Sequence, residues 1–224
     1  MGDNTTSSPA AQYDGHVSGV NPYYALYHEE ALDVVKSVNP NPARWLDTGC
    51  GTGTMVLKAA QYFPEAEYTI ADPSEAMMEL ALKKLKGLPV KPVLAGTQRL
   101  DLPDNSFDVI TAIQSHHYFD ENTRRTATEN CFRMLKPGGV YITFENVKPF
   151  TDEGLKIGLD RWRRYQLNAG RMPEEVERHL SRYGVEYFPI TIDDHMELLR
   201  CCGFTVAEVL FRGLMQAGFY ALKQ

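Results

Sequence analysis

The sequence lacks the features that mark membrane, secreted and zinc-binding proteins. None of its apolar runs approaches the roughly 18 residues that a membrane-spanning helix needs, so we expect no membrane segment. The N-terminus (MGDNTTSSPAAQ) does not show the basic-then-apolar order of a secretion signal. Its four cysteines have no CxxC spacing, which predicts neither a disulfide framework nor a zinc site. These absences favour a reducing, cytoplasmic location and no bound metal.

An excess of positive charge is also missing. The 224-residue chain has 23 lysines and arginines against 29 aspartates and glutamates, a net charge of −6. This balance argues against a surface that coats nucleic acid. Hydrophobic residues make up 43% of the chain, which is typical of a globular protein with a sizeable core. We expect a disordered tail over residues 1–12, which are small and polar, and a single domain over 13–224.

Strands and helices are predicted to alternate along much of the chain. Strands are expected at ARWLDT, AEYTIAD, KPVLAG, FDVITAIQ and VYITFEN, and helices at about 24–38, TMVLKAAQYF, SEAMMELALKKLKG and NTRRTATENCFRML. Ser74 is the expected N-cap of the third of these helices, and Lys-Pro-Gly-Gly is expected to stop the fourth. The alternation predicts an α/β fold with a doubly wound parallel sheet, whose ligands bind beyond the carboxyl ends of the strands.

Residues 148–190 interrupt this alternation. Two helical stretches, about 153–169 and 173–183, precede a further helix at about 191–202. The chain then closes with TVAEVLFRGL and GFYALKQ, which we interpret as an antiparallel pair of strands. The sequence therefore predicts a mostly parallel sheet with an antiparallel end and a helical insert.

The stretch WLDTGCGTGTM places three glycines directly after a predicted strand. Backbone N–H groups at a strand-to-helix junction can face a ligand, and glycine allows its close approach. The spacing is G-x-G-x-G rather than the dinucleotide fingerprint G-x-G-x-x-G. Asp47 precedes the loop, where it would repel a pyrophosphate but suit an ammonium group, and Asp72 ends the next strand, where it could accept both hydroxyls of a ribose. A tight turn without a ligand is the alternative.

Together, LDTGCGTG, IADPSEAMMELA, LPDNSFDVITA and MLKPGGVYITFE resemble the class I S-adenosylmethionine-dependent methyltransferases. The resemblance covers about residues 43–146 and returns in the closing HMELLRCCGFTVAEVLF. It implies a Rossmann-like, seven-stranded sheet with an antiparallel last strand, and S-adenosyl-L-methionine as the cofactor. One segment departs from the family, which often has Gly-Asp-Ala where this chain has Ala95-Gly96-Thr97-Gln98.

The resemblance also implies which residues bind the cofactor. Asp47 and the loop from Gly49 to Gly53 would hold its methionine part, Asp72 its ribose, and Pro73 and Met77 would lie near adenine. The cofactor-binding residues expected in this way are Tyr13, Tyr24, Asp47, Gly49, Cys50, Gly51, Gly53, Asp72, Pro73, Met77, Thr97, Gln98 and Gln114. Thr97 and Gln98 would replace the missing carboxylate, while Tyr13 and Tyr24 either fold over the cofactor or merely cap the core.

The segment IQSHHYF ends the predicted fourth strand, where the family keeps residues near the reactive methyl group. His116 and His117 are therefore candidate general bases, and a structural role at the strand end is the alternative. Gln114 is a candidate for cofactor contact, and Glu145 is expected to face the same cleft. His179 and His195 are interpreted as surface or helix-packing residues.

The insert is the expected substrate-binding segment. Its residues 156–182 carry seven basic against four acidic side chains, a local charge of +3 on an acidic protein. An anionic or aromatic small molecule under a helical lid would contact Trp162, Arg164 and Tyr165. A solvated helical cover of the sheet is an equal alternative, and RNA contact is a third.

These observations predict a methyltransferase that acts on the oxygen or nitrogen of a small-molecule acceptor. A carboxymethyl-cofactor synthase or a tRNA-modification relative of the same fold is the nearest alternative, and the former would need a cation near the methyl carbon. Alternatives of another class are an NAD-dependent dehydrogenase, which the loop spacing and Asp47 oppose, and a catalytically silent cofactor-binding protein.

Overall fold

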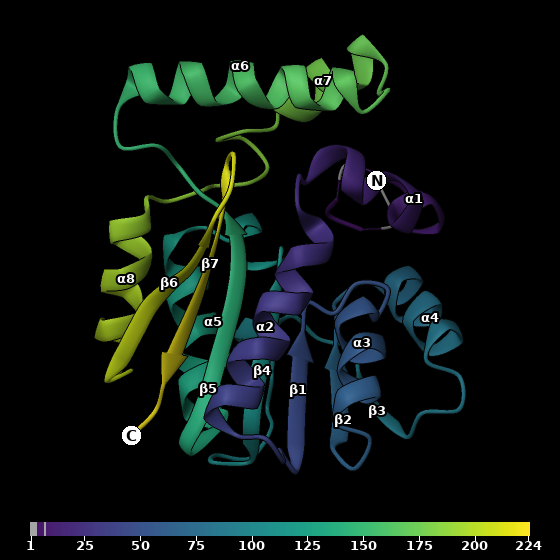
Figure 1. Cartoon of the computed structure of the whole chain (residues 1–224), viewed down its shortest axis with the longest axis vertical. Helices are drawn as coiled ribbons and strands as arrows, with labels where there is room; N and C mark the ends of the chain where they lie inside the picture. The colour runs from purple at the N-terminus through teal and green to yellow at the C-terminus, as the bar shows by residue number, and fades with distance from the viewer. Residues whose placement is uncertain (1–3, 7) are drawn as a thin grey trace.

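One seven-stranded sheet organises the molecule (Figure 1), for which a computed structural model describes residues 4–6 and 8–224. Its strands are β1 (Arg44–Thr48), β2 (Glu67–Ala71), β3 (Val90–Val93), β4 (Phe107–Ile113), β5 (Leu135–Asn146), β6 (Val206–Arg212) and β7 (Gln216–Leu222). Their order is β3-β2-β1-β4-β5-β7-β6. The first five strands pair in parallel, and β7 runs antiparallel to both β5 and β6. The predicted mostly parallel sheet with an antiparallel end is confirmed.

Helices cover both faces of the sheet. On one face α2 (Tyr24–Val38), α3 (Thr54–Tyr62) and α4 (Glu75–Lys84) bury apolar side chains against the strands. On the other face α5 (Glu121–Met134) and α8 (Ile192–Cys201) do the same. Burial within α2 recurs at helical spacing, at Tyr27, Ala31 and Val35, because only one side of the helix meets the sheet. The fold is thus doubly wound.

Local sequence signals set several of these boundaries. The side chain of Ser74 accepts a hydrogen bond from the Met77 N–H at 3.1 Å and caps α4, as predicted. Helix α5 ends at Met134, just before the Lys-Pro-Gly-Gly segment that was predicted to stop it, and β5 begins at Leu135. Its pairing with β4 shifts register between Phe107 and Val109, so the prolyl-glycyl segment is accommodated within the strand as an irregularity.

A third layer lies above the carboxyl ends of the parallel strands (Figure 1). It consists of α1 (Tyr13–Val20), α6 (Asp152–Asn168) and α7 (Pro173–Leu180). Trp162 and Tyr165 of α6 hold the end of α1: the Trp162 Nε1–H donates to the Val20 carbonyl at 2.7 Å and the Tyr165 hydroxyl to the Ser18 carbonyl at 2.6 Å. The insert therefore fixes the N-terminal helix over the strand ends.

The N-terminal segment differs from the predicted disordered tail. Residues 1–3 and 7 lie outside the described part of the chain. Ser8 and Ala10 are buried, and Ala10–Gln12 form a short 3-10 helix that leads into α1. Helix α1 could not be predicted from sequence, because YDGHVSGV has two glycines and little apolar periodicity. Tertiary packing therefore supplies its stability.

Candidate active site

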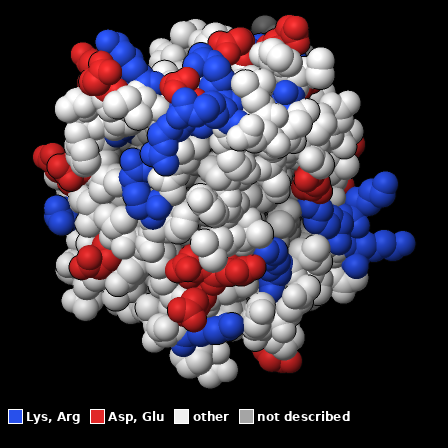
Figure 2. Space-filling view, turned by 45° about the horizontal axis from the view of Figure 1, so that its top comes forward, with Lys and Arg blue, Asp and Glu red and all other residues white. Residues whose placement is uncertain are grey.

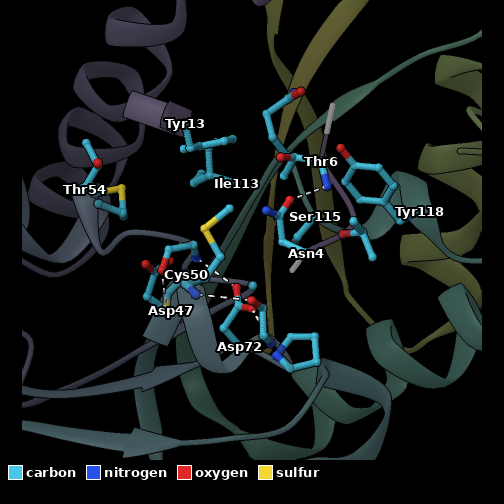
Figure 3. A pocket seen from close by; sticks show the side chains of 18 of the residues that line it. Asn4, Thr6, Tyr13, Asp47, Cys50, Thr54, Asp72, Ile113, Ser115 and Tyr118 are labelled. Carbon is cyan, nitrogen blue, oxygen red and sulfur yellow. Dashed lines mark hydrogen bonds between the residues drawn. The ribbon is translucent and has the colours of Figure 1, made fainter. Parts of the chain in front are cut away.

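A cavity of about 360 Å³ opens at the carboxyl ends of β1, β2 and β4. Figure 3 shows Asp47, Cys50 and Asp72 on one side of it and Asn4, Thr6 and Tyr118 on the other. A volume of this size lies within the range of small-molecule sites, roughly 300–1,000 Å³. This is the location that the parallel topology predicts for a ligand.

The glycine loop forms one wall of the cavity. Its glycines adopt positive φ angles that residues with a side chain rarely adopt, and Gly49 lies where there is no room for a Cβ. Gly49 has a φ of +63°, and a Cβ on it would lie 2.4 Å from the Cβ of Ser115. Gly51 has a φ of +52°, and a Cβ there would meet no described atom within 4 Å. Gly51 also lines the cavity. The loop therefore brings bare backbone to a ligand space, and Gly53 leads from it into α3.

Asp47 and Asp72 are held in different ways. The Asp47 Oδ1 atom accepts a hydrogen bond from the Thr111 hydroxyl at 2.7 Å, whereas its buried Oδ2 has no partner among the described residues. Burial raises the pKa of Asp47 to about 7. Asp72 accepts from the Gly51 and Ser74 N–H groups, each at 2.9 Å, and burial raises its pKa although these bonds oppose the shift. The unpartnered oxygen of Asp47 fits a ligand ammonium group.

The part of the cavity that is expected to hold adenine differs from the prediction at one residue. Pro73, Met77 and Thr97 line the cavity, but Gln98 does not. The Gln98 side chain instead folds against Gly96, where a Cβ would lie 2.6 Å from its Oε1 atom. The Thr97 hydroxyl is already bonded to the Thr48 hydroxyl at 2.6 Å. The structure therefore leaves no side-chain carboxylate or amide of this segment in the cavity.

Tyr13 and Tyr24 both line the cavity, and their hydroxyls hydrogen-bond to each other. Burial raises the pKa of both phenols, so they are neutral at ordinary pH. Tyr23, by contrast, is 61% exposed and packs edge-on against Phe211. Two of the three tyrosines thus lie where a cofactor would be covered, and the third lies outside.

The two adjacent histidines point to different places. They lie in a 3-10 turn, His116–Tyr118, that follows β4 after Gln114. His116 lies outside the cavity, and its ring nitrogens contact the hydroxyls of Thr97 and Tyr141 at 3.0 and 3.2 Å. Burial lowers its pKa to about 4. The structure therefore does not support His116 as a base, because both of its nitrogens are engaged away from the ligand space.

His117 lines a second, smaller chamber of about 30 Å³. This chamber adjoins the cavity, since Thr6, Tyr13, Gln114 and Tyr118 line both. The His117 Nδ1 atom lies 2.7 Å from the Glu145 carboxylate, which also accepts the backbone N–H groups of His116 and His117. Both side chains are almost completely buried.

Glu145 does not face the cleft as expected. Its exposed fraction is 0%, and it lies behind His117. Burial alone would raise its pKa, but the hydrogen bond and charge of His117, with smaller contributions from His116 and Thr143, lower it to about 2. Glu145 is therefore an ionised carboxylate that positions the histidine turn.

The expected substrate contacts on α6 are not found in the structure. Trp162 is fully buried in the cluster that joins α1, α6 and α7, and Tyr165 contacts α1. Arg164 is exposed and forms an ion pair with Asp160 one turn earlier. None of the three lines the cavity or the chamber. They face α1 or solvent because the buried face of α6 is the one that packs on α1.

The basic character of the insert is largely compensated by neighbouring acids. Of the seven basic residues in 156–182, five have an acidic partner within 4.0 Å: Lys156, Arg163, Arg164, Arg171 and Arg182. Figure 2, which brings the top of Figure 1 forward, shows positive and negative side chains side by side on this face. Such pairing favours the solvated cover over the anion-binding lid.

Sequence reasoning missed several lining residues. Ser115 and Tyr118 flank the histidine pair and carried a signal in SHHYF, whereas Asn4, Thr5 and Thr6 line the cavity without any motif. Asn21 and His179 line the chamber, the latter from α7. His179 and His195 are both buried, so they are packing rather than surface residues. Only the fold brings these segments together.

Two negative findings concern the described residues. Within residues 4–6 and 8–224, no helix is long and apolar enough to cross a bilayer. The same residues contain no group of three or more His, Cys, Asp or Glu side chains that could hold a metal ion.

Comparisons with known proteins agree with the geometry. Residues 46–139 match the family model described as "Methyltransferase domain". A demethylmenaquinone methyltransferase of Symbiobacterium thermophilum is 36% identical over 73% of this chain and 68% of its own. A carboxy-S-adenosyl-L-methionine synthase of Nautilia profundicola is 23% identical over 96% of this chain and 92% of its own.

Solved structures share the fold. A SAM-dependent methyltransferase from Aquifex aeolicus superposes with a TM-score of 0.64 at 20% identity, over 97% of this chain and 100% of that one. The matching relative, the family model and the cavity formed by Asp47, the glycine loop and Asp72 agree with one another. The chain belongs to the S-adenosylmethionine-dependent methyltransferases, and S-adenosyl-L-methionine is its cofactor.

Proposed function

We propose that the enzyme methylates an oxygen or nitrogen of a small-molecule acceptor, with His117 as the general base. The observation that carries the proposal is the buried Glu145–His117 pair beside a chamber that shares its wall with the cofactor cavity. When bound, S-adenosylmethionine supplies an electrophilic methyl group. Asp47 would hold its ammonium group, the glycine loop its methionine part, Asp72 its ribose, and Pro73 and Met77 its adenine.

The contact with Glu145 gives His117 a defined tautomer. An ionised carboxylate 2.7 Å from Nδ1 favours the proton on that nitrogen, so that the neutral form of the ring carries its lone pair on Nε2. Nε2 can then take a proton from an acceptor O–H or N–H as the new bond to the methyl carbon forms. Glu145 stabilises the imidazolium that results, as a buried carboxylate does behind a catalytic histidine.

Gln114, Tyr13 and Tyr118 line both the cavity and the chamber, so they lie where the two spaces meet. Gln114 has a φ of +56°, a strained conformation for a residue with a side chain, held by a 2.6 Å hydrogen bond from its N–H to the Phe144 carbonyl. This backbone places its side chain in the walls of both spaces. Positioning and desolvation of this kind supply much of the acceleration of a methyl transfer.

Carboxy-S-adenosyl-L-methionine synthesis, the activity named for several relatives, has less support. A carboxylate on the transferred or accepting carbon needs a cation, and no lysine or arginine is among the described residues that line either space. Arg182 donates to the Thr5 carbonyl and contacts Tyr118, but it does not line the cavity. A neutral acceptor fits these walls better.

The test uses two substitutions at the pair and one at the neighbouring histidine. A panel of phenols, quinols and amines, including demethylmenaquinone analogues, is screened with labelled S-adenosylmethionine, and the best acceptor is used for kinetics. His117→Gln and Glu145→Gln should each lower kcat by about 10²–10⁴-fold, the usual contribution of a general base. The dissociation constant of S-adenosylhomocysteine should stay unchanged.

His116→Gln is the matched control, because the same change is made one residue away in the same turn. It should lower kcat far less than His117→Gln in protein with native circular dichroism. A His117→Gln variant that folds and retains wild-type kcat would contradict the assignment of the base.

A further inference from the structure

The chamber behind Gln114 is built from segments that are distant in sequence. Val17 and Val20 of α1 and the C-cap residue Asn21 close one side of it. His179 reaches it from α7, and Asn146 ends β5 beside it. Its volume of about 30 Å³ gives room for about two or three non-hydrogen atoms, since one water needs roughly 10–15 Å³ by the same measure. It is therefore a compartment for one functional group.

Three polar atoms of its lining side chains lack a hydrogen-bond partner among the described residues. They are Asn21 Oδ1, Gln114 Nε2 and His179 Nδ1. The three side chains are 7%, 8% and 5% exposed, so bulk water does not satisfy them. Buried polar groups in native proteins are nearly always bonded, so three unpartnered atoms around one chamber point to a ligand that bonds them.

Packing holds these groups in place. The His179 ring meets the edge of Trp162 at a centroid distance of 4.8 Å and stacks on Tyr187 at 6.0 Å. Gln114 is fixed by its left-handed backbone. Rigid donors and acceptors of this kind are typical of a site that selects a ligand group by geometry.

The chamber offers no unpaired charge to a ligand, because His117, which lines it, is already paired with Glu145. None of its described lining residues is Asp, Glu, Lys or Arg. Burial lowers the pKa of His179 to about 3, so its ring is neutral. The ionised Glu145 lies directly behind His117 and would repel an anion. A charged group would therefore lose its hydration without gaining a partner, which is strongly unfavourable.

We propose that this chamber binds the uncharged polar end of the acceptor, a carbonyl oxygen adjacent to an O–H or N–H group, and rejects carboxylates, phosphates and ammonium groups. Gln114 Nε2 donates to the carbonyl oxygen, and three atoms compete to accept the hydrogen: Asn21 Oδ1, His117 Nε2 and His179 Nδ1. That the bound group belongs to a methyl acceptor rests on the proposed function. The binding test itself does not need turnover.

The experiment titrates three small probes into enzyme saturated with S-adenosylhomocysteine. Formamide, formate and methylammonium match the chamber in size and differ in charge. Binding is followed by NMR of labelled histidine rings and glutamine side-chain amides. Formamide should shift the signals of His117, His179 and Gln114, with a dissociation constant at least about tenfold lower than that of either ion. Equal responses to all three probes, or no response to formamide, would overturn the proposal and leave the chamber as a site for water only.

Variants locate the binding. His179→Phe and Asn21→Leu should each weaken formamide binding by about tenfold, as expected for the loss of one buried hydrogen bond. His195→Phe is the matched control: His195 is also buried, stacks on Phe219 and has an unpartnered Nε2, but it lines a separate space near Arg124. It should leave formamide binding unchanged. Equal losses in His179→Phe and His195→Phe would refute the location.

The two proposals can fail separately. Selective formamide binding together with normal turnover in His117→Gln would support the chamber as a binding site and exclude His117 as the general base. Loss of turnover in His117→Gln, combined with no formamide binding to the wild-type enzyme, would support His117 as the general base and place the polar end of the acceptor elsewhere.

Discussion

The two sides of the ligand space are built in opposite ways. The cofactor side consists of a contiguous loop and the adjacent strand end, and the carboxylate of Asp72 bonds to the backbone of Gly51 within it. The acceptor side consists of single residues from α1, the histidine turn, β5 and α7. One side is a local structure held mainly by its own backbone, whereas the other exists only when distant elements pack together.

The polar groups of the two sides differ accordingly. The cofactor side presents the carboxylates of Asp47 and Asp72, which suit a ligand with an ammonium group and hydroxyls. The acceptor side presents amides, phenols and imidazoles and no carboxylate of its own. A loop with a fixed backbone can bind a constant cofactor, while a surface assembled from separate helices can change its acceptor without disturbing that loop. The following predictions test whether the two sides can be perturbed independently.

The largest effect is expected from Asp72→Ala on the cofactor side. The substitution removes a carboxylate that could accept ribose hydroxyls and also frees the Gly51 and Ser74 N–H groups. Loss of charge-assisted hydrogen bonds predicts S-adenosylhomocysteine binding weaker by about 10²-fold in calorimetry. Formamide binding in the chamber, measured at saturating S-adenosylhomocysteine, should persist. Asp101→Ala, at an exposed carboxylate outside the site, is the control, and equal affinities in the two variants would place the ribose elsewhere.

The cofactor side could be predicted from sequence because its information is local. The order of strand, acid, three glycines and helix specifies a loop whose geometry depends on its own residues, and Asp72 follows from the next strand end. The sheet was predictable for a similar reason, since alternation and the closing hairpin constrain topology. Gln98 was misplaced because its side-chain direction depends on a 3-10 turn that no periodic pattern reveals.

The acceptor side could not be predicted to the same depth. Choosing between His116 and His117 requires the geometry of the turn after β4, which sends one ring toward Tyr141 and the other toward the chamber. Trp162 was predicted to contact the substrate, because the sequence of an amphipathic helix does not reveal whether an aromatic side chain faces a ligand or packs against another helix. Asn21 and His179 carry no motif, and only the packing of α1 on α6 and α7 brings them together.

A second, smaller effect is expected from pH on the same cofactor side. The pKa of Asp47 is about 7 in the cofactor-free protein because the carboxyl is buried. Only the ionised form attracts an ammonium group, so S-adenosylhomocysteine should bind more tightly as pH rises through 7. With a pKa of about 7, the ionised fraction of Asp47 is about tenfold smaller at pH 6 than at pH 8, so binding should be about tenfold weaker at pH 6. Asp47→Asn should bind weakly with no such dependence, and an unchanged slope in this variant would assign the titration to another group.

The smallest effects are expected in α6, which supports the acceptor side from behind. Trp162→Phe removes the hydrogen bond to the Val20 carbonyl and leaves a buried acceptor unsatisfied, which predicts a loss of about 1–3 kcal/mol in the free energy of unfolding. Hydrogen exchange of α1 amides should accelerate and formamide binding should weaken, because α1 carries Asn21 to the chamber wall.

Arg164→Ala is the comparison within the same helix. Its exposed ion pair with Asp160 is of the kind worth about 0.3–0.5 kcal/mol, so stability, turnover and cofactor affinity should stay close to the wild-type values. A loss of turnover in Arg164→Ala would restore the insert as a direct substrate contact. If instead only Trp162→Phe affects the chamber, α6 acts by positioning α1. Acceptor specificity would then reside in chamber residues such as Asn21 and His179, which α6 supports from behind. This explains how a cover without ligand contacts can still determine what the enzyme methylates.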